Sequence, residues 1–431
     1  MLKGLQRQHL ILGAALLLWF GLMSWLLHLP GNAADPQFVP PDAISYEQAG
    51  QALLKGETSP IRPWGYALLT AIGNGVSQGA VQPILLFLHV LCWLMTGLLL
   101  YRVSETYLQG KWKYLPVLVF ALSPSHIVFA WLTLTETVFT FLLILAAWLM
   151  SFFVQQPDKP QRLIWVNIVL AFACVVRPSL QLPMLVMLLW TAWELWFRTP
   201  RKPLVFLAAF LGVFLIIGFQ ANRMHRQYGQ YTLSFIGKMA WYEYLGAGSQ
   251  ALAEQRDLRV VRHERDSTEV AQFATFEGGA AYWKQRCDFY DADFKAQWQA
   301  HKPLIFKAWL INILQNTREP GAGLSTLNAK GSAPGFNAIR LMAYKGSGYL
   351  NMAMNYLLMP VLLLLLAFRW WKDRRWLPEG QTLAAAFALL LSLFLLLSSG
   401  ASMWQGDRFS MVYYPLILFS LVLLVPKAKN A

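Results

Sequence analysis

The sequence predicts an all-α polytopic membrane protein with about ten transmembrane helices, and two observations support this fold class. Hydrophobic residues make up 56% of the 431 residues and charged residues only 13%, which is about half the charged share of a typical soluble domain. The apolar residues also gather in long uncharged runs, whereas a soluble protein spreads them over amphipathic helix faces. A soluble fold of this size has too little interior to bury so much apolar sequence.

Ten segments are long or apolar enough to be membrane spans. The third and the fifth are short for the ~20 residues that a straight span needs. The first follows Lys3 and Arg7 and is too long for the core of a signal peptide, so we expect an uncleaved signal anchor. The ten segments are 9–29, 83–101, 114–122 with its continuation, 131–154, 163–176, 180–197, 204–220, 350–368, 383–399 and 411–425.

Basic residues in the short loops predict the orientation. If both termini lie in the cytoplasm, the inner segments hold 16 Lys and Arg residues and the short outer loops hold four. We therefore expect a multi-pass protein of the cytoplasmic (inner) membrane, and the net charge of +14 then needs no nucleic-acid partner. The inner residues are Lys3, Arg7, Arg102, Lys111, Lys113, Lys159, Arg162, Arg198, Arg201, Lys202, Arg369, Lys372, Arg374, Arg375, Lys427 and Lys429; the outer ones are Lys55, Arg62, Arg177 and Arg408.

Composition divides the chain into three regions. Residues 1–220 form an N-terminal transmembrane module with a structured first outer loop, residues 221–350 form a long polar external region, and residues 351–431 return to the membrane. The sequence has no internal repeat, which argues against a transporter built from inverted halves.

Two juxtamembrane helices are expected in the first outer loop. The first begins near Asp42 and ends at Gly56, with Tyr46 on its apolar face. The second follows Arg62-Pro63, because proline is favoured in the first turn of a helix, and it has Tyr66 to bury.

The candidate functional residues are ionisable groups in sparse outer loops, all at one level of the membrane. Charges near hydrocarbon are costly, so they tend to be paired or functional. Interfacial anchoring by snorkelling arginines is the alternative, but three arginines together with carboxylates on one side favour function. The residues are Asp42, Arg62, Glu136, Arg177 and the pair Asp407-Arg408.

Each residue type suggests a role. Asp42 is a candidate general base whose ionised form is stabilised at a helix N-terminus, although an ordinary N-cap would also explain an aspartate there. Arg62, Arg177 and Arg408 suit a phosphate because the guanidinium gives bidentate, permanently charged contacts. Glu136, inside an apolar run, should orient an arginine or bind a substrate hydroxyl.

A histidine, an acidic triplet and the cysteines have simpler structural explanations. His126 is a candidate for substrate contact, although a histidine with satisfied hydrogen bonds at the interface is the simpler interpretation. Asp291-Ala292-Asp293 resembles a metal-binding acidic triplet, but we expect a solvated helix face there. The three cysteines have no spacing to histidines that would suit a metal.

The ordered set of features resembles the C-type glycosyltransferases, the membrane class that includes aminoarabinose transferases and protein O-mannosyltransferases. Each stretch is degenerate, and their order along the chain carries the specificity. Four stretches carry the resemblance: Asp42-Ala-Ile-Ser-Tyr46 with Gly56, Arg62-Pro-Trp-Gly-Tyr66, Ser123-Pro124 with Thr135-Glu136, and Gly406-Asp-Arg408-Phe with Tyr414-Pro415.

This resemblance implies an inverting transfer of a monosaccharide from a polyprenyl-phosphate carrier to an acceptor hydroxyl at the outer membrane face. Asp42 matches the base on the acceptor, Arg62 and Arg408 match basic residues near the donor phosphate, and Arg177 matches them more loosely. Tyr46 and Tyr66 would stack on the sugar or simply pack.

The resemblance also bears on cofactors and partners. Many members have a second acidic residue directly after the first, where this chain has Ala43, which argues against a bound divalent metal. We therefore predict no cofactor and expect arginines to neutralise the donor phosphate, with a divalent metal as the open alternative. The partners would be a lipid-linked sugar donor, membrane lipids and an acceptor that is a glycan, a lipid or a protein.

Two other functions stay open. A flippase or transporter of a lipid-linked sugar would place ionisable residues along a path through the bilayer, whereas here they gather at one level. An O-antigen ligase or polymerase would use a diphosphate-linked donor and a histidine in a large external loop, and His225, His263 and His301 keep that alternative open.

Overall fold

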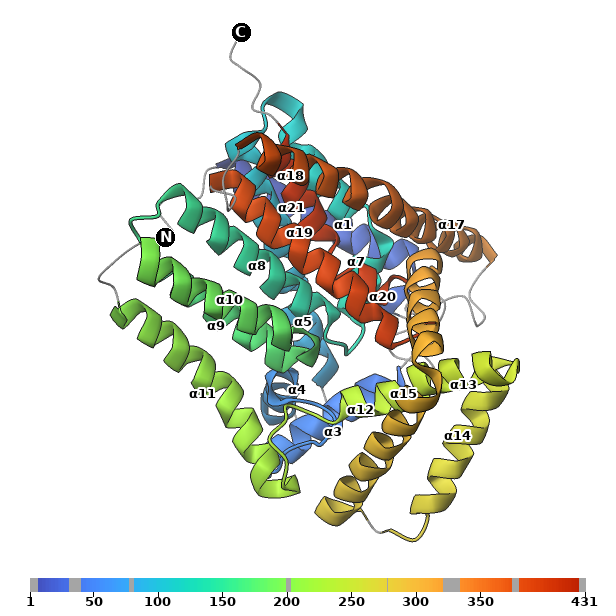
Figure 1. Cartoon of the computed structure of the whole chain (residues 1–431). Helices are drawn as coiled ribbons and strands as arrows, with labels where there is room; N and C mark the ends of the chain where they lie inside the picture. The colour runs from blue at the N-terminus through green and yellow to red at the C-terminus, as the bar shows by residue number, and fades with distance from the viewer. Residues whose placement is uncertain are drawn as a thin grey trace.

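The computed structural model describes residues 7–30, 40–76, 81–198, 203–276, 278–320, 334–373 and 380–425. Within these ranges the chain forms helices and no strands, so the predicted all-α polytopic class is confirmed. In Figure 1 most of the long helices run side by side, and a group of helices from the middle of the chain lies across one end of them.

Seven helical segments in the described ranges are long and apolar enough to cross a membrane, or eight if a bent pair counts as one span. Each of the ten predicted segments falls on an apolar helix, but two of these helices are shorter, so ten spans are not confirmed. The seven involve α1 (Arg7–Leu26), α5 (Val81–Tyr107), α8 (Glu136–Gln155), α10 (Gln181–Trp193), α11 (Pro203–Tyr228), α17 (Pro334–Met352) joined to α18 (Met359–Asp373), and α19 (Gly380–Ser398); the shorter two are α9 (Gln161–Val176) and α21 (Tyr414–Leu424).

The bent pair consists of α6 (Leu115–Ala121) and α7 (Pro124–Trp131), with a bend of 49°. Its cause is local: a residue before proline is disfavoured in the helical region, and Ser123, just before Pro124, is extended with φ −74° and ψ 110°. The third predicted span is therefore a broken helix.

Helices α5, α8, α19 and α21 form the centre of the bundle. Their interior faces are fully buried, and small residues of α19 such as Ala384, Ala385 and Ala388 let α21 approach closely. Helices α1 and α11 instead expose large apolar side chains such as Leu18 and Leu215. Such an outer surface is suited to lipid and not to water.

The segment between α1 and α5, predicted to be the first outer loop, contains the two expected juxtamembrane helices, α3 (Pro41–Leu54) and α4 (Trp64–Val76). They pack against each other, with the Thr70 hydroxyl donating a hydrogen bond to the Tyr46 carbonyl at 3.0 Å. The rings of Tyr46 and Tyr66 meet edge to face at 4.9 Å between centroids.

The described part of the region that is predicted to be external forms a second helical layer, called the external layer below. It consists of α12 (Ile236–Ala240), the π-helix η6 (Trp241–Gly246), α13 (Ala247–Glu254), α14 (Leu258–Phe273) and α15 (Gly279–Arg318). The two ends of this region are continuous with membrane helices, because α11 crosses the 220/221 position and α17 crosses the 350/351 position.

Ion pairs hold the external layer together. Asp291 accepts from Lys238 at 2.6 Å and Asp293 accepts from Arg265 at 2.5 Å. The acidic triplet therefore links helices of this layer, and Asp293 in particular is largely buried in its ion pair.

Helix α15 kinks at His301, where φ is −136°, two residues before Pro303. The kink turns its apolar second half back toward the membrane helices. There Asn312 donates to the Gly400 carbonyl at 3.0 Å, and Asn316 donates to the Ser402 carbonyl at 2.8 Å. These bonds fix the external layer against the end of α19.

Candidate active site

Five of the predicted charged residues meet in one network, although they come from four separate parts of the chain. Arginines and carboxylates alternate along it, and four of the five side chains line a cavity of about 890 Å³. In order the groups are Arg62, Asp42, Arg408, Glu136 and Arg177.

Asp42 lies in the first turn of α3 and is held between two arginines. Its Oδ1 is 2.6 Å from Nη2 of Arg62, and its Oδ2 is 2.7 Å from Nη1 of Arg408. The N-cap of α3 is Pro40, and no side chain caps this helix. The simpler explanation of Asp42 as an N-cap is therefore wrong, and its carboxylate instead faces the cavity.

Arg62 is fixed on every side of its guanidinium. Besides its ion pair with Asp42, it donates from Nε to the Ser45 hydroxyl at 2.8 Å and from Nη1 to the Tyr46 hydroxyl at 3.3 Å. Its guanidinium also lies 4.3 Å from the centre of the Tyr46 ring. Arg62 is thus positioned before any ligand binds.

Glu136 begins α8 and is completely buried. Its Oε1 accepts from Nε of Arg408 at 2.5 Å and lies 3.7 Å from Nη2 of Arg177. The N-terminus of a helix adds favourable partial charge for such a carboxylate. Glu136 therefore lies between two arginines.

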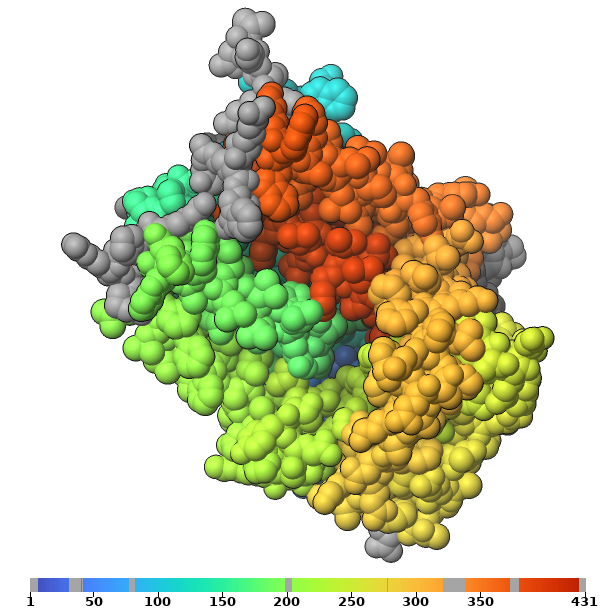
Figure 2. Space-filling model, viewed as in Figure 1, coloured from blue at the N-terminus to red at the C-terminus, as the bar shows by residue number. Residues whose placement is uncertain are grey.

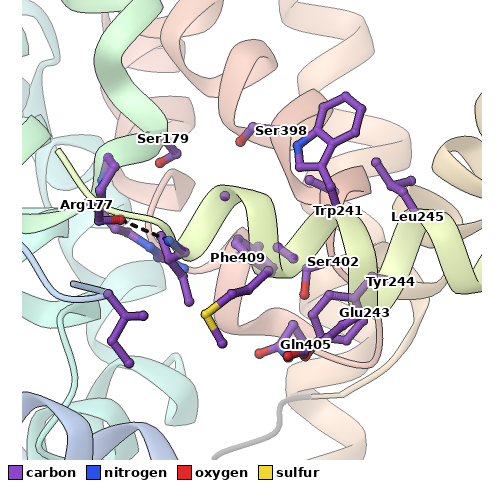
Figure 3. Close-up of a pocket in the computed structure, with 18 of the residues that line it drawn as sticks. Arg177, Ser179, Trp241, Glu243, Tyr244, Leu245, Ser398, Ser402, Gln405 and Phe409 are labelled. Carbon is purple, nitrogen blue, oxygen red and sulfur yellow. Dashed lines mark hydrogen bonds between the residues drawn. The ribbon is translucent and has the colours of Figure 1, made fainter. Parts of the chain in front are cut away.

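Arg177 ends α9 and precedes Pro178, with an extended backbone at φ −143°. Its guanidinium lies 4.9 Å from the ring centre of Phe409 and 5.5 Å from that of Phe139. The Nη1 atom is buried and has no hydrogen-bond partner in the part of the chain that the structure describes. Figure 3 shows Arg177 at one end of the cavity, with Phe409 beside its middle.

Charge decides the protonation of Asp42. Burial by itself would raise the pKa of this carboxyl, but the charges and hydrogen bonds of Arg408 and Arg62 outweigh burial and lower the pKa to about 2. Asp42 is therefore ionised at neutral pH, and it is a weak base as long as both arginines hold it.

The neighbours Asp407 and Arg408 face in different directions. They follow Gly406, whose φ of +51° lies in the left-handed region that favours glycine. Arg408 enters the network, whereas the fully buried carboxyl of Asp407 accepts a hydrogen bond from Ser125 of the broken span. Burial raises the pKa of Asp407 to about 7, against the opposing effect of the Ser125 hydrogen bond.

The remaining predicted site residues lie at different depths. Tyr46 lines the cavity beside Arg62. Tyr66 and His126 are buried and do not line it: the Tyr66 hydroxyl lies 3.1 Å from Nε2 of His89, and His126 bonds the Ser123 hydroxyl and the Met411 carbonyl. Both side chains support the packing behind the site.

One wall of the cavity was missed by reasoning from the sequence. It comes from the external layer and contributes aromatic rings and one carboxylate, and only the interleaving of aromatic and charged residues in this region could have pointed to it. Its residues include Trp241, Glu243, Tyr244, Trp298, Phe306 and Trp309.

No group of three His, Cys, Asp or Glu side chains that could hold a metal occurs among the described residues. At the position after Asp42, Ala43 is completely buried and offers no ligand. The charged partners of Asp42 in the structure are arginines.

A helical bundle with several apolar spans defines a polytopic membrane protein, and a comparison with protein families indicates which kind. Residues 57–219 match the model of the dolichyl-phosphate-mannose-protein mannosyltransferase family. This match indicates a membrane glycosyltransferase and supports the resemblance to the C-type class. It covers fewer than half of the residues.

The matched segment contains Arg62, Glu136 and Arg177, whereas Asp42 and Arg408 lie outside it. The geometry of the site joins these two residues to the matched ones. A search of curated proteins and a search of solved structures found no match.

Proposed function

We propose that this chain is an inverting glycosyltransferase that moves a monosaccharide from a polyprenyl-monophosphate carrier to an acceptor hydroxyl. The observation that carries the proposal is the alternating network on the cavity, in which three arginines meet two carboxylates. The network therefore has one net positive charge. Permanently charged, planar guanidinium groups at the ends of apolar helices are suited to a lipid-linked phosphate.

The charge of the network favours a monophosphate donor. A sugar joined to a polyprenyl chain through one phosphate carries one negative charge, which matches the single excess arginine. A diphosphate-linked sugar carries two. The unpartnered Nη1 of Arg177 supplies one donor for such a phosphate without breaking an existing bond.

The proposed reaction is a single displacement at the anomeric carbon. The acceptor oxygen attacks the face opposite the phosphate, the bond from the anomeric carbon to the phosphate oxygen breaks, and the configuration inverts. Asp42 takes the acceptor proton as general base. The electron pair of the broken bond remains on the phosphate, whose growing charge Arg62, Arg177 and Arg408 stabilise.

Donor binding would also activate the base. Arg62 and Arg408 hold Asp42 in the empty site at 2.6 and 2.7 Å. When a phosphate takes over part of their hydrogen bonding, the charge that lowers the Asp42 pKa is partly neutralised. Asp42 then becomes a stronger base at the moment when the sugar to be transferred is bound.

The proposed location is the outer face of the cytoplasmic membrane, with both termini inside. The distribution of Lys and Arg over the short loops supports this orientation. The alternatives fit less well. None of His225, His263 and His301 lines the cavity, as a ligase or polymerase would need. A flippase would need charges spread along a path, whereas these five groups form one cluster.

The test uses purified protein, polyprenyl-phosphate-linked monosaccharides and detection of released polyprenyl phosphate. Arg62→Ala should weaken donor binding about 10- to 100-fold, because it removes charge-assisted hydrogen bonds worth about 1.5–3 kcal/mol. Arg102→Ala is the control, since Arg102 is exposed and pairs with Glu105 one helical turn away. Absence of turnover with every monophosphate donor, or a preference for diphosphate donors, would overturn the proposal. Unchanged donor binding in Arg62→Ala would place the phosphate elsewhere.

A further inference from the structure

The cavity has two chemically different walls. Arginines and Asp42 line the wall that the membrane module provides, while the external layer provides a wall rich in aromatic rings. Figure 2 shows the surface hollowed between α10, α19 and α15, with the N-terminal part of the chain visible at its floor. A ligand bound at Asp42 would therefore have the external layer on its other side.

The π-helix η6 supplies the centre of the aromatic wall. Short π-helical turns are rare and occur frequently at functional sites. Four of its six residues line the cavity: Trp241, Glu243, Tyr244 and Leu245. In Figure 3 these four labelled side chains lie at the opposite end of the cavity from Arg177.

Glu243 is the one carboxylate on this wall. The structure gives it no hydrogen bond and no ion pair within the described part of the chain. Arg262 on α14, whose charge acts on Glu243, stacks over Tyr244 at 4.7 Å and over Trp404 at 5.3 Å. Burial and the charge of Asp266 raise the pKa of Glu243, against the opposing charge of Arg262. Because Glu243 has no partner among the described residues, its carboxyl group is available for hydrogen bonds with a ligand.

The wall is held firmly from behind. The Tyr242 hydroxyl donates to the Arg265 carbonyl at 3.0 Å, and the Arg265 guanidinium pairs with Asp293 and lies 4.0 Å from the Tyr242 ring centre. A Cβ at Gly246 would come within 2.7 Å of Arg265. These contacts hold η6 in place against α14 and α15.

We propose that η6 forms the acceptor subsite and that the acceptor group is a sugar ring of a glycan or glycolipid. This inference rests on the proposed glycosyl transfer. The rings of Trp241 and Tyr244 would cover the apolar face of the sugar, and Glu243 would accept hydrogen bonds from its hydroxyls. The sugar hydroxyl that reacts would then point across the cavity toward Asp42.

A sugar fits this wall better than a peptide segment does. Recognition of an extended peptide commonly uses free backbone N–H and C=O groups. The wall consists of residues from η6 and α15, whose backbone groups are largely engaged within these helices. What it offers is ring faces and a carboxylate.

The experiment separates the acceptor from the donor. Short-chain alkyl glycosides of hexoses and pentoses serve as acceptor probes, and a peptide with Ser and Thr is the competing probe. For each variant we would measure the acceptor KM, the donor KM and donor hydrolysis without acceptor. Glu243→Gln should raise the glycoside KM about tenfold or more, because one strong hydrogen bond acceptor becomes a weaker one, while donor KM and hydrolysis stay within about twofold.

The control is Glu264→Gln, because Glu264 lies on the exposed surface of α14, pairs with Arg256 and does not line the cavity. Trp241→Ala provides a second variant, with the same expected rise in acceptor KM and recovery in Trp241→Phe. A changed donor KM in Glu243→Gln, or an unchanged acceptor KM, overturns the inference. Transfer of the sugar to the peptide and not to the glycosides would also overturn the inference. The same holds if the protein hydrolyses the donor but transfers its sugar to none of the glycosides. Complete absence of donor turnover in the unmodified protein would instead refute the proposed function.

Discussion

Asp42→Asn tests the proposed chemistry most directly, because the substitution keeps the size of the side chain and removes its charge and basicity. A positioned general base contributes about 10²- to 10⁴-fold to a rate. We therefore expect kcat to fall by that factor. If Asp42 were only a structural partner of the arginines, the rate of transfer would fall only to the extent that donor affinity falls.

The same substitution should not weaken donor binding. Without Asp42, Arg62 keeps its hydrogen bonds to Ser45 and Tyr46, and Arg408 keeps Glu136 at 2.5 Å. The arginines stay in place but lose a competitor for the phosphate. Because the Asp42 side chain is 36% exposed, each lost ion pair is worth at most about 1 kcal/mol after screening. Donor affinity should therefore stay constant or increase by up to about fivefold for each pair.

The assay measures two quantities on detergent-purified protein: the rate of sugar transfer, and the affinity for polyprenyl phosphate by titration. Glu47→Gln is the matched control, because Glu47 lies on the same helix and does not line the cavity. Transfer by Asp42→Asn at a near wild-type rate would refute the base assignment. A parallel loss of rate and donor affinity would mean that Asp42 organises the arginines and does no chemistry.

Two further substitutions test how the fold positions the site. A Cβ at Gly65 would lie 2.7 Å from the backbone of Val175, so Gly65→Ala must push α4 away from α9. We expect a lower melting temperature, a free energy of unfolding reduced by about 1–3 kcal/mol, and weaker donor binding. Gly75→Ala is the control and should show none of these effects, because nothing lies within 4 Å of a Cβ at Gly75. Asp407→Asn should change how stability depends on pH. Burial raises the Asp407 pKa from 3.8 to about 7, so the folded state binds a proton that the unfolded state has released. The free energy of unfolding of the wild-type protein should therefore fall by up to about 4 kcal/mol as the pH rises from about 4 to 7. Thermal unfolding at pH 5 and pH 8 checks this, since Asp407→Asn should be the more stable protein at pH 8, and an equal pH dependence in both proteins would contradict it.

The charged half of the site could be predicted from the sequence because the bilayer restricts where charges can lie. Sparse ionisable groups at the ends of apolar runs must share a narrow layer, and five of the six proposed groups indeed form one network. The exception is Asp407. Asp407 and Arg408 are consecutive residues of the short helix α20 (Asp407–Ser410), so their side chains point about 100° apart. Which of the two faces the cavity depends on how α20 packs, and the sequence alone does not show this.

The aromatic half could not be predicted, because its assembly depends on two local irregularities. The kink of α15 at His301 brings Trp309 and Phe306 back to the cavity, and the π-helical turn of η6 presents Glu243 and Tyr244 together. A periodicity of 3.6 residues describes neither. In the sequence Glu243 is also indistinguishable from the many charged residues of the external region.

The alternation of arginines and carboxylates determines when the proposed base Asp42 can act. Three arginines in a partly buried cavity repel one another, and the carboxylates of Asp42 and Glu136 reduce this repulsion before the donor arrives. Of the two, Glu136 is completely buried and stays with its arginines, whereas Asp42 is partly exposed on the cavity. Phosphate can therefore replace Asp42 but not Glu136. On the proposed mechanism the base with a pKa of about 2 cannot activate water in the empty site, and it gains strength only when the sugar to be transferred lies beside it.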